Sequence, residues 1–421
     1  MADTKTILLI GTLDTKAHEY AYLRDLIQRR GHRTLVMDAS VFDSTATARA
    51  APLMPDIDAA QVAQAGGSDL VALREQGDRN QALVIMTQGC VALARQLFAE
   101  GRFDAVLGLG GSGGTALATA VMRELPIGVP KVMVSTIASG DVGPYVGAVD
   151  ITMLHSVVDI AGLNRISRRV LMNAVGAVCG MVEQQAMTTD QAADRPLITA
   201  TMFGVTTPCV THLRERLEGA GYEVLVFHAT GNGGRAMEAL IAGGLVAGVA
   251  DVTTTEWADE LVGGMLGAGP HRLEAAARQG VPQVVSCGAL DMVNFLGPFE
   301  SIPARFKDRH FHIHNANVTL MRTTPAECAE LGHIIAEKLN RSTGPTTLLV
   351  PLKGVSMLDS KGASFYDPEA DAALFDALRR HVRTPPVDLI ELDLHINDPE
   401  FADALADHLL TALAQVQINN T

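Results

Sequence analysis

Short apolar segments alternate with longer amphipathic segments along the whole chain. The apolar segments are 6–11, 33–38, 104–109 and 131–136 in the first half, and 197–203, 223–228, 282–287, 311–314, 346–351 and 387–392 in the second. Near-continuous apolar runs of this length are typical of strands in a parallel sheet that is covered on both faces. The segments between them have helical spacing, and 18–31 places Leu23 and Ile27 on one face before Gly31. The pattern therefore predicts an α/β fold with mostly parallel, doubly wound sheets.

A polar segment at 184–196 separates two halves of the chain. The 421 residues, of which 48% are apolar, exceed the usual size of one domain and suffice for two cores. Five residues within 23–36 recur within 213–226, each time in a strand–helix–Gly–strand unit, which favours an internal duplication over convergence. We therefore expect two Rossmann-like domains, 1–190 with a glycine-rich anion-binding loop, and 195–421.

The most informative motif is GLGGSGGTA, residues 108–116, which follows an apolar segment and precedes a helix. Such a turn gathers free main-chain N–H groups at the positive end of a helix dipole, and glycines let a phosphate approach the backbone. The expected anion-binding residues are Gly110, Gly111, Ser112, Gly113, Gly114 and Thr115. The alternative is a tight turn without a ligand.

Two familiar nucleotide loops do not fit this motif. Ser135 and Thr136 end the next apolar segment, where a dinucleotide site would have a ribose-binding acid. No lysine follows the glycines, as it would in a Walker loop. NAD and a Walker-type site are therefore disfavoured.

Three further loops follow predicted strands, at the sheet edge where open α/β sheets bind ligands. Their candidate ligand-binding residues are Gly11, Thr12, Asp14 and Lys16; Thr136, Ser139, Gly140 and Asp141; and, in the second domain, Gly231, Gly233, Gly234 and Arg235. Each loop alone is equally well explained as a capped turn. Together they predict a ligand cleft between the domains, with Asp14 or Asp141 as ligands for Mg²⁺.

A second set of residues offers acid–base or metal chemistry. Strand alternation places His310, His312 and His314 on one face, where they could hold a transition metal or simply make hydrogen bonds. Asp291, which follows a strand, and Lys353 are further candidates. These residues suit an alternative function, an enzyme acting on a small anionic metabolite such as a sugar acid or phosphosugar.

The overall charge restricts the possible partners. A formal net charge of −14 argues against nucleic-acid or anionic-membrane surfaces. The apolar runs fall short of the roughly 20 residues that span a bilayer, and the N-terminal segment has no basic region, so we expect a cytoplasmic protein. The five cysteines are widely spaced and indicate neither a disulfide framework nor a zinc site.

The order of several blocks gives a more specific indication. These blocks include GTLDTK, GGSGGT, STIASGD, DIAGLN, HATGNGGRAMEAL, CGALDMVNF, HNANVTLMRTT and HINDPEFA. Over nearly its full length the chain resembles the uncharacterised bacterial and fungal proteins related to the N-terminal inhibitory domain of the tomato mosaic virus resistance protein. The resemblance implies two Rossmann-like domains, ATP binding and self-association into homodimers. The plant domain also binds a viral replication protein, an activity that a stand-alone relative need not share, so the protein partner stays open. No individual ATP contact follows from the resemblance.

Overall fold

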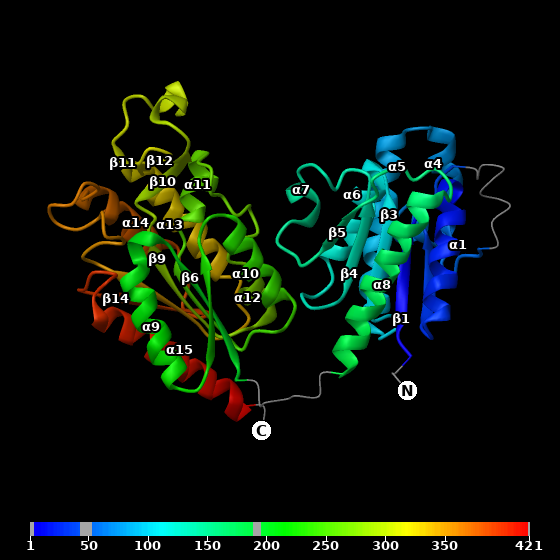
Figure 1. Ribbon diagram of the computed structural model, residues 1–421. Coiled ribbons are helices and arrows are strands. Elements are labelled where there is room, and N and C mark those ends of the chain that lie inside the picture. The colour runs from blue at the N-terminus through cyan, green and yellow to red at the C-terminus, as the bar shows by residue number, and fades with distance from the viewer. Residues whose placement is uncertain (1–3, 43–52, 188–194, 420–421) are drawn as a thin grey trace. The chain divides into compact units, whose positions relative to one another are not determined.

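The computed structural model describes residues 4–42, 53–187 and 195–419. The chain divides into two compact units, Met1–Ala192 and Ala193–Thr421, and each unit contains its own parallel sheet (Figure 1). Within the predicted linker at 184–196, residues 188–194 lie outside the described residues. The two units are described separately below.

Unit 1 is a five-stranded parallel sheet in the order β2-β1-β3-β4-β5. Its strands are β1 (Thr6–Gly11), β2 (Arg33–Asp38), β3 (Ala105–Gly110), β4 (Lys131–Ser135) and β5 (Thr152–His155). Its helices are α1 (Leu13–Arg29), α3 (Ala59–Ala65), α4 (Leu70–Gln76), α5 (Arg79–Ala99), α6 (Ser112–Arg123), α7 (Gly143–Val146) and α8 (Arg165–Met187). Alternate residues of β1 enter two cores: Ile7 and Leu9 pack with α1 and α8, and Leu8 and Ile10 pack with α3, α5 and α6.

Unit 2 is a six-stranded parallel sheet in the order β14-β13-β9-β8-β6-β7. Its strands are β6 (Leu197–Met202), β7 (Glu223–His228), β8 (Gly248–Thr253), β9 (Gln283–Gly288), β13 (Thr346–Pro351) and β14 (Val387–Leu392). One face is covered by α9 (Thr207–Gly219) and α15 (Pro399–Asn419), and the other by α11 (Glu256–Val262), α13 (Pro325–Leu339) and α14 (Pro368–His381). The helices α10 (Asn232–Ala242) and α12 (Ala275–Gln279) pack side by side.

Unit 2 also contains a small antiparallel sheet in the order β10-β12-β11. Its strands are β10 (Met292–Leu296), β11 (Phe311–Asn315) and β12 (Val318–Arg322), and the short 3₁₀ helices of the unit are η1 (Gly204–Thr206), η2 (Phe299–Ser301) and η3 (Ala304–Phe306). The predicted fold class, an α/β protein with two doubly wound, mostly parallel sheets, is confirmed.

The first four sheet positions have the same connectivity in both units. The second strand of each unit lies outside the first, and the third strand pairs with the other side of the first, giving the order 2-1-3-4. Successive strands are therefore added on one side of the first strand and then on its other side. This change of side falls between β1 and β3 in unit 1, and between β6 and β8 in unit 2. Doubly wound sheets bind ligands in the crevice at this switch point, beyond the carboxyl ends of the strands.

One described helix, α5, is long and apolar enough to cross a membrane by length and composition alone. Its residues Ala82, Met86, Cys90 and Ala94 are buried in the core that α5 shares with α3 and α6.

Candidate functional site

The turn from β3 to α6 lies beside the switch point of unit 1. A single residue, Gly111, separates the last residue of the strand from the first residue of the helix. A Cβ atom on Gly110 would lie 2.9 Å from the Cα atom of Gly114, and one on Gly108 would lie 2.7 Å from the Cβ atom of Ala118. These two positions therefore need glycine so that the strand and the helix can approach each other.

Gly111 and the two glycines in the first turn of the helix have no such steric reason. A Cβ atom on Gly113 would meet nothing within 4 Å, and one on Gly111 would lie 3.8 Å from Thr136 Oγ1. On Gly114 the nearest atom would be the Leu109 carbonyl oxygen at 3.5 Å, which is ordinary contact. Contacts within unit 1 thus leave these three glycines unexplained.

The first turn of α6 presents unpaired main-chain donors. The first helical hydrogen bond runs from Thr115 N–H to the Gly111 carbonyl at 2.8 Å, so the N–H groups of Ser112, Gly113 and Gly114 precede it. Within residues 4–42, 53–187 and 195–419, no acceptor is found for these three donors. Ser112 is exposed and its hydroxyl can join them. Three N–H groups at one helix end form an anion-binding arrangement.

The side chain of Thr115 does not take part in the predicted anion-binding turn. Its side chain is fully buried, and its hydroxyl lies 2.7 Å from the Ser135 hydroxyl on β4. Because this hydrogen bond joins α6 to β4, the Thr115 hydroxyl has a structural role and is not presented to a ligand.

The loop after β1 lies on the other side of the switch point, but its amides are already used. Leu13 N–H donates to Asp38 Oδ1 at 3.1 Å, and Asp14 N–H donates to Ser40 Oγ at 2.8 Å. Lys16 donates through its ammonium group to the Ile160 carbonyl. The side chains of Asp38, which ends β2, and of Ser40 just beyond it therefore bond these amides in place of an external anion.

Gly11 is explained by packing rather than by a ligand. A Cβ atom there would lie 2.0 Å from the Tyr20 hydroxyl, which accepts a hydrogen bond from Leu109 N–H at 3.0 Å. Tyr20 thus ties α1 to β3 directly beneath the switch point. Gly11 lets this side chain fit.

Asp14 and Thr12 are the other two predicted ligand-binding residues of the loop after β1. Asp14 is 8% exposed, and Thr15 Oγ1 donates to its Oδ1 at 3.3 Å. Burial, together with the neighbouring Asp38 carboxylate, raises the pKa of Asp14 above its usual range. Thr12 is the N-cap residue of α1, and its side chain makes no capping hydrogen bond.

The loop after β4 contributes one residue to the glycine turn. Thr136 N–H donates to the Gly110 carbonyl at 3.2 Å, which places Thr136 next to Gly111. Asp141 Oδ1 accepts from Gly143 N–H at 2.9 Å at the start of α7, and Ser139 and Gly140 are exposed. Asp141 is therefore bonded to the backbone of its own loop, and Thr136 is the residue of this loop that lies beside the turn.

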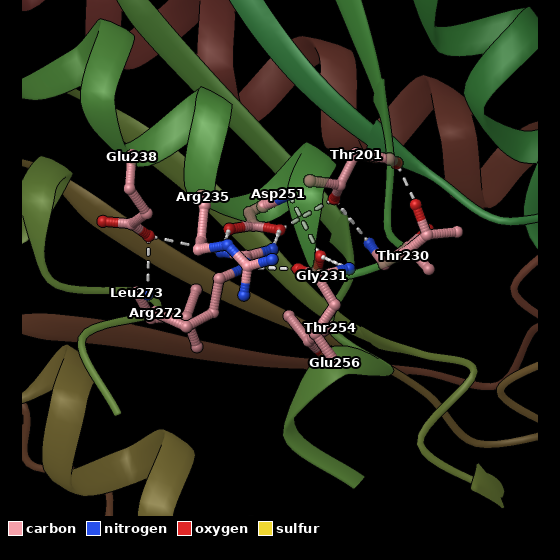
Figure 2. A network of polar contacts seen from close by, with 12 residues as sticks. Thr201, Thr230, Gly231, Arg235, Glu238, Asp251, Thr254, Glu256, Arg272 and Leu273 are labelled. Atoms are coloured by element: carbon pink, nitrogen blue, oxygen red, sulfur yellow. Dashed lines mark hydrogen bonds and ion pairs between the residues drawn. The ribbon is translucent and has the colours of Figure 1, made fainter. Parts of the chain in front are cut away.

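The glycine loop of unit 2 holds a carboxylate from its own chain (Figure 2). Gly231 N–H and Gly234 N–H donate to Glu256 Oε1 at 2.7 and 3.0 Å. A Cβ atom on Gly234 would lie 2.1 Å from Glu256 Oε2, and one on Gly233 would lie 1.9 Å from the His228 carbonyl oxygen. The Glu256 carboxylate therefore occupies the position where the sequence predicts a bound anionic ligand. The sequence analysis did not identify Glu256.

Glu256 belongs to a buried charge network centred on Arg272 (Figure 2). Arg272 is 1% exposed and donates to Asp251 Oδ1 at 2.6 Å and to Glu256 Oε2 at 2.7 Å, while Glu238 lies 3.4 Å away. Burial alone would lower the pKa of Arg272, but the three carboxylates hold it well above its usual range. The predicted residue Arg235 instead donates to the Gly267 carbonyl at 3.2 Å.

The three histidines do not form the predicted metal site. His310 and His312 both pack edge-on against Phe365, and His312 Nδ1 lies 3.2 Å from Ser364 Oγ. The pairing of β11 with β12 shifts register between Ile313 and Asn315, which interrupts the strand alternation at His314. Within the described part of the chain, no group of three His, Cys, Asp or Glu residues could hold a metal ion.

The other acid–base candidates are engaged with protein groups. Asp291 is buried and accepts from Ser356 Oγ at 2.7 Å, and exposed Lys353 lies 2.9 Å from Asp393. Among the predicted sites in the described part of the chain, the turn at Gly110–Gly114 is therefore the one that keeps three consecutive unpaired main-chain N–H groups.

Comparison with known proteins matches both units to one family. The models of the N-terminal and C-terminal domains of the uncharacterised protein family UPF0261 match residues 5–187 and 195–413. A UPF0261 protein of Clostridium tetani is 51% identical over 97% of this chain and 99% of its own length. The tomato ToMV resistance protein Tm-1(GCR237) is 40% identical over 97% of this chain, and the chain spans 56% of that protein.

Solved structures resemble the chain only distantly. A putative UDP-N-acetylglucosamine 2-epimerase from Listeria monocytogenes aligns with 93% of this chain and all of its own, at 15% identity and a TM-score of 0.25.

Proposed function

We propose that this chain, which belongs to the uncharacterised protein family UPF0261, is a cytoplasmic ATP-binding protein whose glycine turn in unit 1 holds the phosphates. The observation that supports the proposal is the set of three unpaired N–H groups on Ser112, Gly113 and Gly114. They lie at the end of α6, beside the switch point at which doubly wound sheets bind ligands.

The first turn of α6 has no side chain at Gly113 or Gly114, which supports the proposal that a ligand makes close contact with the backbone there. Because a Cβ atom on Gly113 would occupy open space, a side chain there would cost the protein no packing, yet the chain has glycine. A phosphate that contacts the main chain gives a reason for this choice. Ser112 begins α6 and Thr136 lies beside Gly111, so their hydroxyls can act as further donors.

The resemblance to the tomato resistance protein's N-terminal domain is the reason for naming ATP among phosphate-bearing ligands. A triphosphate in an acidic protein needs a cation, and Mg²⁺ is usually held by one or two carboxylates together with phosphate oxygens. Asp14 is the carboxylate we propose for this role, because it belongs to the loop after β1 at the switch point, whereas Asp141 accepts a hydrogen bond from Gly143 N–H. The same resemblance underlies our proposal that the protein forms homodimers.

A thermal-unfolding assay with Mg·ATP tests the proposal. Ligand at about 100 times its dissociation constant stabilises a protein by about 2.7 kcal/mol, which raises the Tm of a unit of this size by several degrees. Gly113→Asp places a carboxylate where we propose the phosphate, so this variant should fold and lose the shift.

The matched control is Asn80→Asp. Asn80 is the second residue of α5, as Gly113 is of α6, so the control adds the same charge at the same helical position of the same unit. It should keep the full shift. No shift of the natural protein at millimolar Mg·ATP, or an equal shift in Gly113→Asp, would contradict the proposal.

The alternative function, an enzyme for a small anionic metabolite, loses support from the geometry of unit 2. Its candidate groups Asp291 and Lys353 are bonded to Ser356 and Asp393, and the three histidines are not assembled. The glycine turn itself suits a phosphosugar as well as a nucleotide. Competition between ATP and inorganic phosphate or a sugar phosphate in the same assay separates these ligands.

A further inference from the structure

A cavity of about 580 Å³ lies in unit 2 at the carboxyl ends of β13 and β14. Its lining includes Leu352 and Lys353, which directly follow β13, and His395, which lies shortly after β14. Open α/β sheets bind ligands beyond the carboxyl ends of their strands, and small-molecule sites usually have volumes of roughly 300–1,000 Å³. The place and the size of this cavity therefore suit a small ligand.

One wall of the cavity belongs to the loop 352–367, which connects β13 to α14. Connections of this kind usually have roughly 2–6 residues, and much longer ordered ones are usually functional. This loop is fixed by buried hydrogen bonds: Val355 N–H donates to Asp359 Oδ2 at 2.9 Å, and Ser356 Oγ donates to Asp291 Oδ2 at 2.7 Å. The wall is therefore formed before any ligand arrives, which lowers the entropy cost of binding.

Three side chains of this loop bring unused donors to the cavity. Ser360, Lys361 and Tyr366 line it. Among the residues that the structure describes, nothing forms a hydrogen bond or ion pair with the two hydroxyls or with the Lys361 ammonium group. Two hydroxyls and one ammonium group on the same wall are donors for a negatively charged group.

The cavity wall is cationic, although the chain has a net charge of −14. In the described part of unit 2, the lining residues include Lys353, Lys361 and Arg379 and a single acidic residue, Asp371. Arg322 Nη2 lies 2.7 Å from Asp371 Oδ1, so this carboxylate is already paired. A local group of cations of this kind is what an acidic protein needs in order to hold an anion.

Two of the three cations also contact carboxylates, but these contacts are exposed. Lys353 Nζ lies 2.9 Å from Asp393 Oδ2, and the two side chains are 55% and 82% exposed. Arg379 donates through Nη1 to Asp376 and through Nε to Glu391, and all three side chains are partly exposed. Exposed ion pairs contribute little to stability, so both cations can turn to a ligand.

Apolar and aromatic side chains complete the lining. Leu352 and Tyr366 are 36% and 45% exposed, and Phe375 of α14 lies among the lining residues with them. His395 adds a ring without a free donor, because main-chain groups bond to both of its ring nitrogens. A flat ring can pack against these side chains.

We propose that this cavity binds a small organic anion that has a ring and a phosphate or carboxylate group. The ring packs against Tyr366, and the negative group accepts hydrogen bonds from Ser360 and Lys361. Lys353 and Arg379 add positive charge nearby. All residues of this site belong to unit 2, and the proposal does not rest on the nucleotide site proposed in unit 1.

Isothermal titration calorimetry of the full chain with phenyl phosphate and with benzoate tests this proposal. Benzyl alcohol, which has the ring without the charge, and inorganic phosphate, which has the charge without the ring, are the control ligands. At least one of the two ring anions should bind at least about tenfold more tightly than either control. Gly113→Asp should bind it with unchanged affinity. Binding that this variant abolishes would place the anion in unit 1 and overturn the proposal.

Two variants test the assigned residues. Lys361→Gln removes the unpaired charge and Tyr366→Ala removes the ring, and each should weaken binding by about tenfold or more. Both side chains are exposed, so both variants should fold. The matched control is Lys307→Gln, which changes an exposed lysine of unit 2 outside the cavity and should keep the natural affinity. No binding of either ring anion at millimolar concentration, or equal affinity in Lys361→Gln and the natural protein, would overturn the proposal.

Discussion

At the scale of single residues, the glycines of the turn after β3 have two different roles. Gly108 and Gly110 allow α6 to approach the sheet, because a Cβ atom at either position would lie within 3.0 Å of α6. Gly113 has open space around its Cα atom instead. The sequence alone does not separate these roles, since the residues are identical in type and adjacent. Only the packing distances distinguish the structural glycines from those we assign to the ligand.

Alanine substitutions should separate the two roles. Gly113→Ala should leave the free energy of unfolding unchanged or raise it by up to about 1 kcal/mol, because alanine favours the helix, yet weaken ATP binding. Gly110→Ala should lower stability by about 1–3 kcal/mol through overpacking. Urea unfolding and ATP titration measure these effects. Gly176→Ala, at an equally open position in α8, is the control that should leave binding intact.

At the scale of the elements, the sequence predicts the strands whose apolar runs are unbroken and misses others. The strands β8 and β12 were not predicted, and each carries a charged residue, Asp251 or Arg322, whose buried partners come from distant segments. Likewise Asp38 and Glu256 were missed because their bonds to the first turns of α1 and α10 join residues 22 or more positions apart. The one signal in the sequence for Asp38 is its place as an acidic residue at the end of a predicted strand, where dinucleotide-binding folds often have a ligand-binding acid. Such pairings depend on tertiary contacts.

The contact between α10 and α11 should depend on Glu256. Glu256→Ala removes the acceptor for two buried amides and one of the partners of Arg272, so we expect the free energy of unfolding of unit 2 to fall by about 3–5 kcal/mol. Glu260→Ala, which removes an exposed carboxylate of the same helix, should cost less than about 1 kcal/mol. Chemical denaturation followed by Trp257 fluorescence reports on unit 2, because Trp257 is the single tryptophan of the chain. Equal losses in both variants would contradict this role.

At the scale of the whole molecule, the alternation of apolar and amphipathic segments was sufficient to predict the fold class. It was insufficient for the antiparallel sheet, because the sequence analysis identifies β11 but neither β10 nor β12 as a strand. The glycine turn could be located because its composition is unusual. The other loops of the predicted site could not be assessed from composition. Whether their main-chain N–H groups are free depends on side chains from elsewhere in the same unit.

Unit 2 should become less stable as the pH rises from about 5 to 8. Burial raises the pKa of Asp259 and of Asp291 to about 7 and that of Asp371 to about 8. A carboxyl whose pKa is higher in the folded state stabilises that state below its ordinary pKa of about 3.9, and this stabilisation is lost as the pH rises through the folded value. The expected loss is about 1.4 kcal/mol per pH unit for each such proton.

Urea unfolding followed by Trp257 fluorescence at several pH values measures this loss. Asp371→Asn should reduce the slope, because it removes one of the three protons. Stability that rises over this pH range would show that the buried carboxyls are ionised in the folded protein.

The central claim is that the first turn of α6 binds phosphate. A crystal structure of the full chain grown with Mg·ATP tests it most directly. We predict phosphate oxygens within hydrogen-bond distance of the N–H groups of Ser112, Gly113 and Gly114. Nucleotide bound at another place, with these three N–H groups bonded to water or to protein, would contradict the account.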